Sequence, residues 1–429
     1  MARRARIPMA GNTRSSLYCQ RLLRGICPCI SPPSRPHRTL QERRIMISDP
    51  VTLKYILNSP RFTLGHSQRK TTTLLFGQDN MLIMNGENHR RIRNIVNPWF
   101  SSKSVRSALP VIRENVRKAI DLWESQGLPG NTLDVSPTFQ NSALDILGDA
   151  LLEYRFDALT GQSELSTLQR NILDISSSPT KLGQLGEAAL SYIPDTVVNL
   201  ASHLPMPTMR TVKQYQRLTE ALSNHLIQQK RETAGLGTDH SLISHLIGQK
   251  TSNTGTRILD NEIPVHLRTI LVGGGDTVSS AIVWTVYKIA QMKGLQHDLR
   301  SEIQAANGNG MDGLEYDSLP LLNATINEAL RLFSPFPLAE RVATEDCVLP
   351  LGQPITTTTG VQISEIPIKK GQAIFVAIAS YHRVFSIWGP DALEFRPSRW
   401  LEEEPCKGSA LGPHASLLTF LAGPHVYPG

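Results

Sequence analysis

Apolar residues return at steps of three and four along much of this chain, the spacing that places side chains on one face of an α-helix. The pattern is densest over residues 87–122, where Pro98 and Pro110 are expected to divide the stretch into shorter helices. Near the start, Asp49 and Pro50 predict a turn that leads into a short helix. Further helices are predicted over 139–154, 211–233, about 263–293 and about 319–333.

The pattern changes after Ser334 and Pro335. These residues are expected to end the last long helix, because a residue before proline disfavours helical backbone. Residues 356–376 are then typical of short strands and turns. A polar stretch rich in Gly, Ser and Thr over 232–262 predicts a loop with one short helix. The fold is therefore predicted to be mainly α with a small β region.

The composition is that of a globular protein: 429 residues, 40% hydrophobic and 19% charged. The net charge of +7 is concentrated in residues 1–45, which hold ten Arg and one acid and so carry +9, leaving −2 for the rest. A near-neutral body argues against a nucleic-acid-binding face. We predict an Arg-rich, disordered segment over 1–44 and a folded domain over 45–429. A transit peptide is the alternative for the first segment.

The cysteines and the hydropathy indicate which redox compartment the chain suits and whether it contains a membrane-spanning helix. An odd number of cysteines without zinc spacing indicates a reducing compartment and no disulfide framework. No stretch reaches the ~18 apolar residues that a membrane-spanning helix needs. The five cysteines are Cys19, Cys27, Cys29, Cys347 and Cys406.

Three consecutive glycines, Gly273 to Gly275, fall inside the longest predicted helix. Each costs about 1 kcal/mol relative to Ala in a helix interior, so their presence needs a reason. One explanation is that something flat and bulky approaches the backbone, and the other is close packing against a second helix. Asp276 and Thr277 follow, and a hydroxyl there can bond back to a carbonyl or donate to a ligand.

Two charged motifs follow. Glu328 and Arg331 are spaced i, i+3 on the predicted helix over 319–333, opposite an apolar face, so a solvent-exposed ion pair is the simpler interpretation. Arg399 lies in a segment rich in proline and aromatic residues, where pairing with a carboxylate and a solvated charge are the alternatives.

Two further motifs offer ligand contacts. The final ten residues have Gly and Pro at both ends, which predicts a tight loop. Its centre offers His425 and Tyr427 as metal or haem contacts, with a frayed tail as the alternative. Early in the chain, His89 and Arg93 are spaced i, i+4, where they can hold one anion or form a solvated basic turn.

In this order and at this spacing, the motifs resemble the cytochrome P450 family of haem-thiolate monooxygenases, most closely its fungal microsomal members. The resemblance covers Ile45 to Gly429. It matches residues 273–277 to the family's oxygen-binding helix signature, and Glu328 and Arg331 to its E-x-x-R helix. The implied architecture is the cytochrome P450 fold, incomplete at the C-terminus.

The resemblance implies a role for each candidate residue. Asp276 and Thr277 would be the catalytic pair that relays protons. Glu328, Arg331 and Arg399 would form a cluster that locks the core. The basic residues among the cofactor-binding positions would hold the haem propionates. These cofactor-binding positions are His89, Arg93, Gly274, Arg341, Phe420, Gly423 and His425.

The chain departs from the family pattern at its end. Tyr427 stands at the axial metal-ligand position, where the family has the Cys whose thiolate pushes electron density onto the iron. A phenolate also ligates haem in some proteins, but Tyr is longer, and a loop shaped for Cys would have to retreat. The chain stops at Gly429, so the family's final helix and hairpin are expected to be absent, as is its usual N-terminal anchor.

Three functional hypotheses follow. The first is a haem b-dependent monooxygenase that inserts one oxygen atom from O2 into a small apolar substrate, with electrons from NADPH delivered by NADPH-cytochrome P450 reductase. The second is a catalytically inactive relative or truncated gene product, because Tyr427 replaces the thiolate ligand. The third is a binding protein that uses the Arg-rich tail on anionic membranes or nucleic acid, and only residues 1–45 favour it.

The resemblance also implies a location and excludes some partners. Family members of this kind lie at the endoplasmic reticulum membrane. Because no transmembrane anchor is recognised, a cytoplasmic location is the alternative. We expect no nucleic-acid partner and no DNA-binding face.

Overall fold

The structure is a computed structural model. Its described residues divide into two compact units. We call His66–Ser279 the helical unit, and residues 37–65 together with Ser280–Tyr427 the mixed unit. The structure describes residues 37–39, 42–126, 133–161, 163–177, 190, 192–201, 206–232, 242, 258–306, 314–402, 406, 411, 412, 414 and 416–427.

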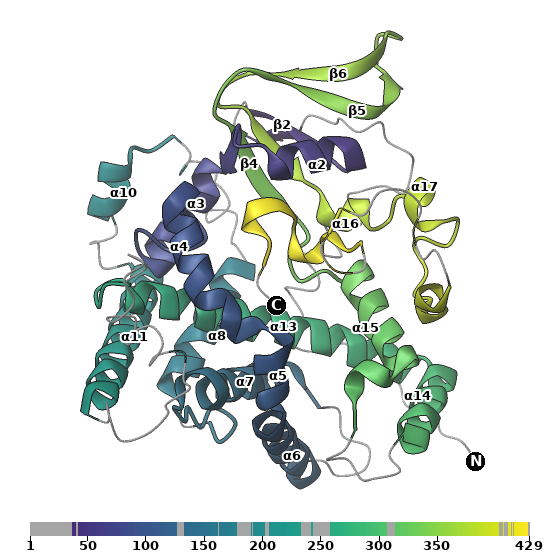
Figure 1. The fold of residues 1–429 in the computed structure, drawn as a ribbon. Helices are drawn as coiled ribbons and strands as arrows, with labels where there is room; N and C mark the ends of the chain where they lie inside the picture. Colours follow the sequence, from purple (N-terminus) through teal and green to yellow (C-terminus); the bar gives the residue numbers. More distant parts are fainter. Residues whose placement is uncertain are drawn as a thin grey trace. The chain divides into compact units, whose positions relative to one another are not determined.

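Every described element of the helical unit is a helix (Figure 1). The α-helices are α3 (His66–Phe76), α4 (Gly86–Val96), α5 (Ser102–Ser107), α6 (Leu109–Gln126), α7 (Ser136–Leu147), α8 (Glu164–Ser177), α10 (Asp195–Ala201), α11 (Pro207–Glu232) and the first part of α13 (Ile263–Gln291). A 3₁₀ turn, η1 (Asn97–Phe100), follows helix α4, and a π turn, η2 (Gly148–Leu152), extends helix α7.

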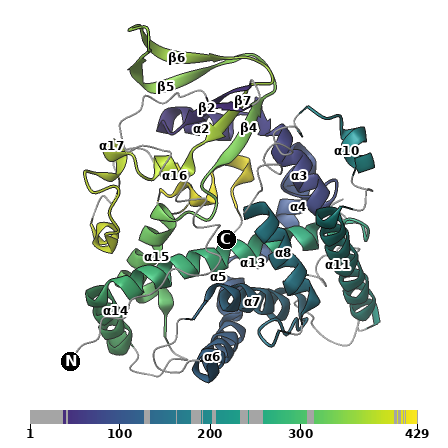
Figure 2. The ribbon, with the colours of Figure 1, turned by 180° about the vertical axis from the view of Figure 1, so that it is seen from behind.

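The sequence predicted most of these helices. Pro98 lies in η1, and Pro110 is the second residue of α6, where its missing N–H costs no helical hydrogen bond. The helices predicted over 139–154 and 211–233 are confirmed as α7 with η2 and as α11. The predicted loop over 232–262 lies mostly outside the described residues. Helices α8 and α11 pack side by side in both views (Figures 1 and 2).

The mixed unit is built on two sheets. The larger has the order β1-β2-β7-β4-β3, in which β2 and β7 are parallel and the other pairs antiparallel. The smaller is the hairpin of β5 and β6. The strands are β1 (His37–Thr39), β2 (Glu42–Ile47), β3 (Phe62–Leu64), β4 (Ala339–Ala343), β5 (Cys347–Thr356), β6 (Gln362–Ile368) and β7 (Ala373–Val376).

The mixed unit also contains helices and 3₁₀ turns. Its α-helices are α2 (Pro50–Asn58), the rest of α13, α14 (Lys293–Ala306), α15 (Pro320–Leu332), α16 (Ile378–Tyr381) and α17 (Phe385–Trp388). Its 3₁₀ turns are η5 (Tyr316–Ser318), η6 (Pro397–Leu401), η7 (Leu418–Phe420) and η8 (Gly423–His425). The helix predicted over 319–333 is confirmed as α15, which ends before Ser334 and Pro335 as expected.

Helix α2 shows why the predicted turn after Asp49 works. The Asp49 carboxylate accepts hydrogen bonds of 2.9 and 2.8 Å from the backbone N–H and the hydroxyl of Thr52, which caps the helix. Pro50 occupies the first turn, where a missing N–H is harmless. The buried Leu53 and Ile56 then join one apolar core with strands β2 and β7.

The fold class is confirmed: the described chain is mainly α with a small β region. The predicted boundary at residue 45 stays a prediction. Strands β1 and β2 begin before that residue, and residues 1–36 lie outside the described part.

The sequence predicted no stretch apolar enough to cross a membrane. Helix α13 is nevertheless long and apolar enough by length and composition, and it is the one such helix among the described residues. A core helix of a soluble protein passes the same test, so this single helix is weak evidence for a membrane span.

Candidate functional site

Glu328 and Arg331 of α15 form a fully buried ion pair, each with 0% exposure. Arg331 Nε and Nη2 donate hydrogen bonds of 2.8 and 2.7 Å to Glu328 Oε2 and Oε1. Each carboxylate oxygen accepts one more bond, from the Arg396 backbone N–H at 2.9 Å and from the Trp400 indole N–H at 3.0 Å. Four donors offset the cost of burying this carboxylate.

This burial corrects the sequence-based interpretation of a solvent-exposed pair. The predicted apolar face of α15 is the more open one, since Ile326 is 38% exposed. The pair is buried because distant backbone supplies acceptors. Arg331 Nη1 donates to the carbonyls of His382 and Ala392 at 2.7 and 2.6 Å, and Nη2 donates to the Glu394 carbonyl at 3.0 Å.

Arg399 lies beside this pair and is 2% exposed. Its Nε is 3.7 Å from Glu328 Oε1, and its other guanidinium nitrogens donate to the Trp388 carbonyl and to Asp391. The structure thus brings together the three residues that the resemblance grouped. We call Glu328, Arg331 and Arg399 the charge cluster.

Residues Leu417–Tyr427, which we call the terminal segment, form a tight loop with the turns η7 and η8. The Tyr427 backbone N–H donates to the Phe420 carbonyl at 2.9 Å. Gly423 has φ +75°, and a Cβ there would lie 2.2 Å from the Leu57 carbonyl oxygen at the end of α2. Only glycine fits this position. Gly429, the end of the predicted loop, lies outside the described residues.

Arg341 and Tyr427 are electrostatic neighbours within the mixed unit. Arg341 is 8% exposed, on a central strand between Leu64 and Ile374. Its guanidinium donates to the Glu340 carbonyl at 3.0 Å and pairs with no described carboxylate. Burial raises the pKa of the Tyr427 phenol, although Arg341 pulls that pKa down. The phenol is therefore held in its neutral form near neutral pH.

His382 is a buried residue that sequence reasoning missed. It is 0% exposed, and its Nε2 accepts a 2.9 Å hydrogen bond from the Leu418 backbone N–H. Burial, with Arg331 and Arg383 nearby, holds its pKa well below the usual value. No spacing in the sequence marks this residue, because its partners lie 36 and 51 residues away.

His89 and Arg93 lie one turn apart on α4 in the helical unit. Burial lowers the pKa of His89, and the Arg93 charge lowers it further. Burial also lowers the pKa of the Arg93 guanidinium, which pairs with no described carboxylate. The neighbouring Arg91 is different, since it forms a 2.7 Å ion pair with Glu262 just before α13. Among the described residues, Arg93 is therefore a half-buried cation with no paired carboxylate.

The three glycines of α13 have different surroundings. A Cβ on Gly274 would lie 3.1 Å from Leu147 of α7, and one on Gly275 would lie 3.1 Å from Gln169 Nε2 of α8. Nothing lies within 4 Å of a Cβ on Gly273. Close helix packing thus accounts for Gly274 and Gly275, and Gly273 is the position left open.

Hydrogen bonds from side chains reach the backbone of this glycine turn. Gln169 Nε2 donates to the Leu271 carbonyl at 3.0 Å, and a side chain at Gly275 would crowd that amide. The Thr277 hydroxyl donates to the Gly273 carbonyl at 2.6 Å, which is one of the two roles that the sequence left open. Gln169 had no sequence signal, because its contact spans 102 residues.

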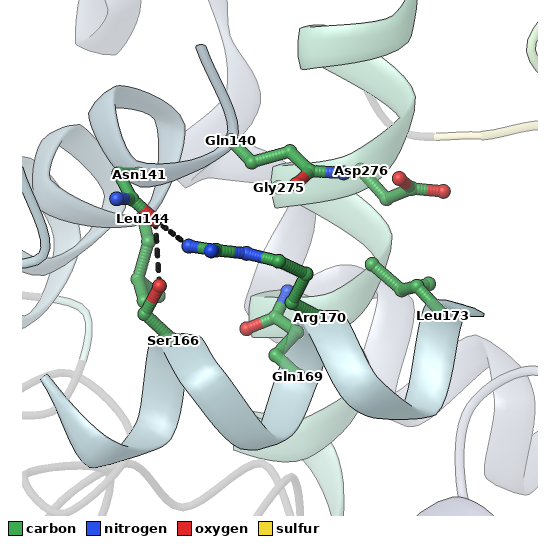
Figure 3. A pocket seen from close by; sticks show the side chains of 9 residues that line it. All are labelled: Gln140, Asn141, Leu144, Ser166, Gln169, Arg170, Leu173, Gly275 and Asp276. Atoms are coloured by element: carbon green, nitrogen blue, oxygen red, sulfur yellow. Dashed lines mark hydrogen bonds between the residues drawn. The ribbon is translucent and has the colours of Figure 1, made fainter. Parts of the chain in front are cut away.

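A small polar pocket lies beside Asp276, between α7, α8 and α13 (Figure 3). Asn141 Oδ1 accepts hydrogen bonds from the Ser166 hydroxyl and from Arg170 across this pocket. Burial raises the pKa of the Asp276 carboxyl, and a hydrogen bond from Gln140 opposes that rise. Asp276 is therefore an acid whose proton is held more firmly than usual.

Comparison with known proteins now decides the family. The family model for Cytochrome P450 matches residues 37–429. The chain belongs to the cytochrome P450 family. Cytochrome P450 monooxygenase 91 of Postia placenta is 30% identical over 408 residues, covering 89% of this chain and 74% of that relative. Cytochrome P450 monooxygenase claP of Ampulloclitocybe clavipes is 28% identical over 417 residues, covering 93% and 75%.

The cytochrome P450 fold is confirmed by a solved structure as well. The crystal structure of the cytochrome P450 CYP102L1 matches with a TM-score of 0.72, covering 98% of this chain and 89% of that one. Its sequence identity is 20%, so this match speaks for the fold alone. The family is one of haem monooxygenases, and haem is the cofactor that it implies.

The residues present suit the haem propionates but not a thiolate ligand to the iron. Haem b carries carboxylates, and the mixed unit holds Arg341 as a buried cation that no described carboxylate neutralises. In the helical unit, taken by itself, Arg93 is a half-buried cation of the same kind. Buried cations of this kind need an anion. Tyr427, which the resemblance assigns to the axial-ligand position, has a neutral phenol and does not fit thiolate chemistry.

Proposed function

We propose that this cytochrome P450 binds haem b and acts as a monooxygenase that inserts one oxygen atom from O2 into a small apolar organic substrate. The observation that carries the proposal is Arg341 of the mixed unit, a buried cation that lacks a carboxylate partner among the described residues. Its charge is opposite to that of a haem propionate, and the family resemblance assigns it to propionate binding.

Each predicted site residue has a part in this proposal. His89, Arg93, Arg341 and His425 would hold the propionates. The haem, when bound, supplies the activation of O2. The close-packed Gly274, together with Phe420 and Gly423 of the terminal segment, would shape the surroundings of the cofactor.

Asp276 and Thr277 would handle the protons. The raised pKa of Asp276 keeps a proton available on its carboxyl closer to neutral pH than on an ordinary Asp. The Thr277 hydroxyl donates its own proton to the Gly273 carbonyl, so its oxygen is left to accept one.

Haem titration of the purified protein tests this function. Arg341→Gln and Arg93→Gln should each weaken haem binding about tenfold or more, because each removes a charge-assisted pair. Arg90→Gln is the matched control, since Arg90 is an exposed residue of the same helix as Arg93. Equal haem affinity in all three variants and the parent protein would contradict the proposal.

A catalytically inactive relative is the second candidate, and Tyr427 favours it. A neutral phenol is a poor replacement for a thiolate, because it does not push electron density onto the iron. We expect the reduced, carbon-monoxide-treated protein to lack the red-shifted Soret band of a thiolate-ligated haem. Tyr427→Cys should restore that band in a protein that folds and binds haem, and Tyr427→Phe should not. Seeing the band in the parent protein would remove this candidate.

The remaining proposals follow from family membership. Electrons from NADPH would come through NADPH-cytochrome P450 reductase. The protein would associate with the endoplasmic reticulum membrane, with a cytoplasmic location as the alternative. Residues 1–44 would form a segment separate from a cytochrome P450 domain over 45–429, and no nucleic-acid partner is proposed.

A further inference from the structure

We propose that His382 is a positioning residue that ties the terminal segment, and with it Tyr427, to the charge cluster. Its backbone bonds to the charge cluster, and its side chain bonds to the terminal segment. The backbone carbonyl of His382 accepts from Arg331 Nη1 at 2.7 Å, and its ring Nε2 accepts from the Leu418 N–H at 2.9 Å. Both His382 and Leu418 are 0% exposed, so water cannot replace either bond.

The Leu418 bond fixes the start of the path to Tyr427. Leu418 opens the turn η7, which ends at Phe420, and the Phe420 carbonyl accepts the Tyr427 N–H at 2.9 Å. Holding Leu418 therefore holds the carbonyl on which the Tyr427 backbone rests. The His382 ring accepts the first hydrogen bond in this series, from the Leu418 N–H.

Backbone strain inside the loop makes such an anchor necessary. Leu421 has φ +59°, a value that a residue with a branched side chain rarely adopts. Strain of this kind persists only where the surroundings fix the chain on both sides. Leu418 is fixed by His382 on one side, and Gly423 is fixed against Leu57 on the other.

The His382 ring itself is not optimised for stability. A backbone N–H can only donate, so Nε2 must be the unprotonated nitrogen and the ring proton must sit on Nδ1. Nδ1 is buried and has no hydrogen-bond partner in the part of the chain that the structure describes. An apolar ring of the same shape would avoid this unpaired donor, so the acceptor at Nε2 is the feature that explains a histidine here.

Amide hydrogen exchange of the full chain tests the proposal. His382→Phe keeps an aromatic ring against Trp388, whose ring centroid lies 5.9 Å from that of His382, but removes the acceptor. We expect exchange at Leu418 and Leu421 to become about tenfold faster or more, because the Leu418 N–H loses its acceptor. Unchanged protection of these amides in a folded His382→Phe protein would overturn the proposal.

Two conservative variants separate positioning from packing. Gln places its carbonyl oxygen near the position of Nε2, whereas Asn places it near that of Nδ1. His382→Gln should therefore restore the protection of Leu418, and His382→Asn should not. If both variants protect the segment equally, or if both unfold, the role of His382 is packing and the proposal is wrong.

The inference deepens the proposed function, on which the importance of the Tyr427 position rests, but its test does not depend on haem. Failure of haem binding would leave the exchange result unaffected. Exposed His297, changed to Gln, is the control for loss of a histidine elsewhere in the mixed unit.

Discussion

At the residue scale, Glu328 is a fully buried carboxylate whose partners stabilise its charge. Its carboxylate is 0% exposed and accepts four hydrogen bonds, two of them from Arg331. A buried ion pair contributes little net stability when intact, but breaking it leaves an uncompensated buried charge.

Glu328→Gln should destabilise the protein strongly. The amide is neutral and turns an NH2 group toward donors, so Arg331 loses its counter-charge. We expect a loss of about 3–5 kcal/mol in the free energy of unfolding, measured by urea denaturation. Glu365→Gln, at an exposed position on β6, is the control and should change it by less than about 0.5 kcal/mol. A loss below about 1 kcal/mol for Glu328→Gln would show that the cluster is not stabilised as described.

A variant of Gly423, compared with one of Gly360, separates the energetic cost of steric overlap from that of a positive φ. Gly423→Ala places a Cβ 2.2 Å from the Leu57 carbonyl oxygen at φ +75°, whereas Gly360→Ala meets nothing within 4 Å at the similar φ of +82°. Gly360→Ala should cost about 1–2 kcal/mol from backbone conformation alone. Gly423→Ala should cost clearly more, because backbone atoms must move. Equal unfolding free energies for the two variants would refute the close approach to α2.

At the scale of the element, α13 combines a long apolar helix with a weak turn. Its glycines differ in what they face, so a single explanation does not serve all three. Gln169 and Thr277 bind two carbonyls of that turn and support it from the side.

Two alanine variants of α13 should change stability in opposite directions. Gly273→Ala should raise the unfolding free energy by about 0.5–1 kcal/mol, because the Cβ has space and alanine favours helix. Gly275→Ala should lower it, because the Cβ crowds Gln169 and disturbs its bond to Leu271. Thermal unfolding of the protein without added haem measures both. Two changes of the same sign would contradict this assignment.

Helices could be predicted from the sequence where the pattern of neighbouring residues is sufficient to specify them. Proline positions and apolar periodicity marked α4 to α7, α13 and α15 to within a few residues. Spacing alone favoured a solvent-exposed pair on α15, because i, i+3 spacing fixes which residues share a face but not which face is buried. The resemblance, in contrast, grouped Glu328 and Arg331 with Arg399 in a cluster that locks the core, and these residues are buried together. Arg331 is buried because His382, Ala392 and Glu394 supply acceptors more than 50 residues away.

At the scale of the whole molecule, buried histidines make stability depend on pH. Burial lowers the pKa of His266 on α13 to about 4, and it lowers that of His382 as well. The unfolded chain takes up these protons near pH 6.5, while the folded chain takes up that of His266 only near pH 4. Below pH 6.5 the unfolded state therefore binds more protons, and stability falls as the pH falls.

His266→Leu should flatten this dependence. The pKa difference between the unfolded and folded states corresponds to about 3 kcal/mol, present in full above pH 6.5 and lost by about pH 4. Urea unfolding at several pH values between 7 and 4 measures the slope in the parent and variant. Asp145 and Asp276, with raised pKa values, act in the opposite direction in both proteins and cancel in the comparison. An unchanged slope in His266→Leu would contradict the burial of a neutral imidazole.

The sequence by itself determined the helices, the glycine turn and the set of motifs that identify a cytochrome P450, because periodicity, proline and short spacings act over a few residues. The assignment of Tyr427 to the position of the family's thiolate stays a prediction from the resemblance. Only the tertiary structure decided that Glu328 and Arg331 are buried, that Gln169 and His382 support the glycine turn and the terminal segment, and that Arg93 and Arg341 lack described carboxylate partners. Those properties depend on hydrogen bonds and desolvation between residues far apart in the chain, which no local pattern encodes.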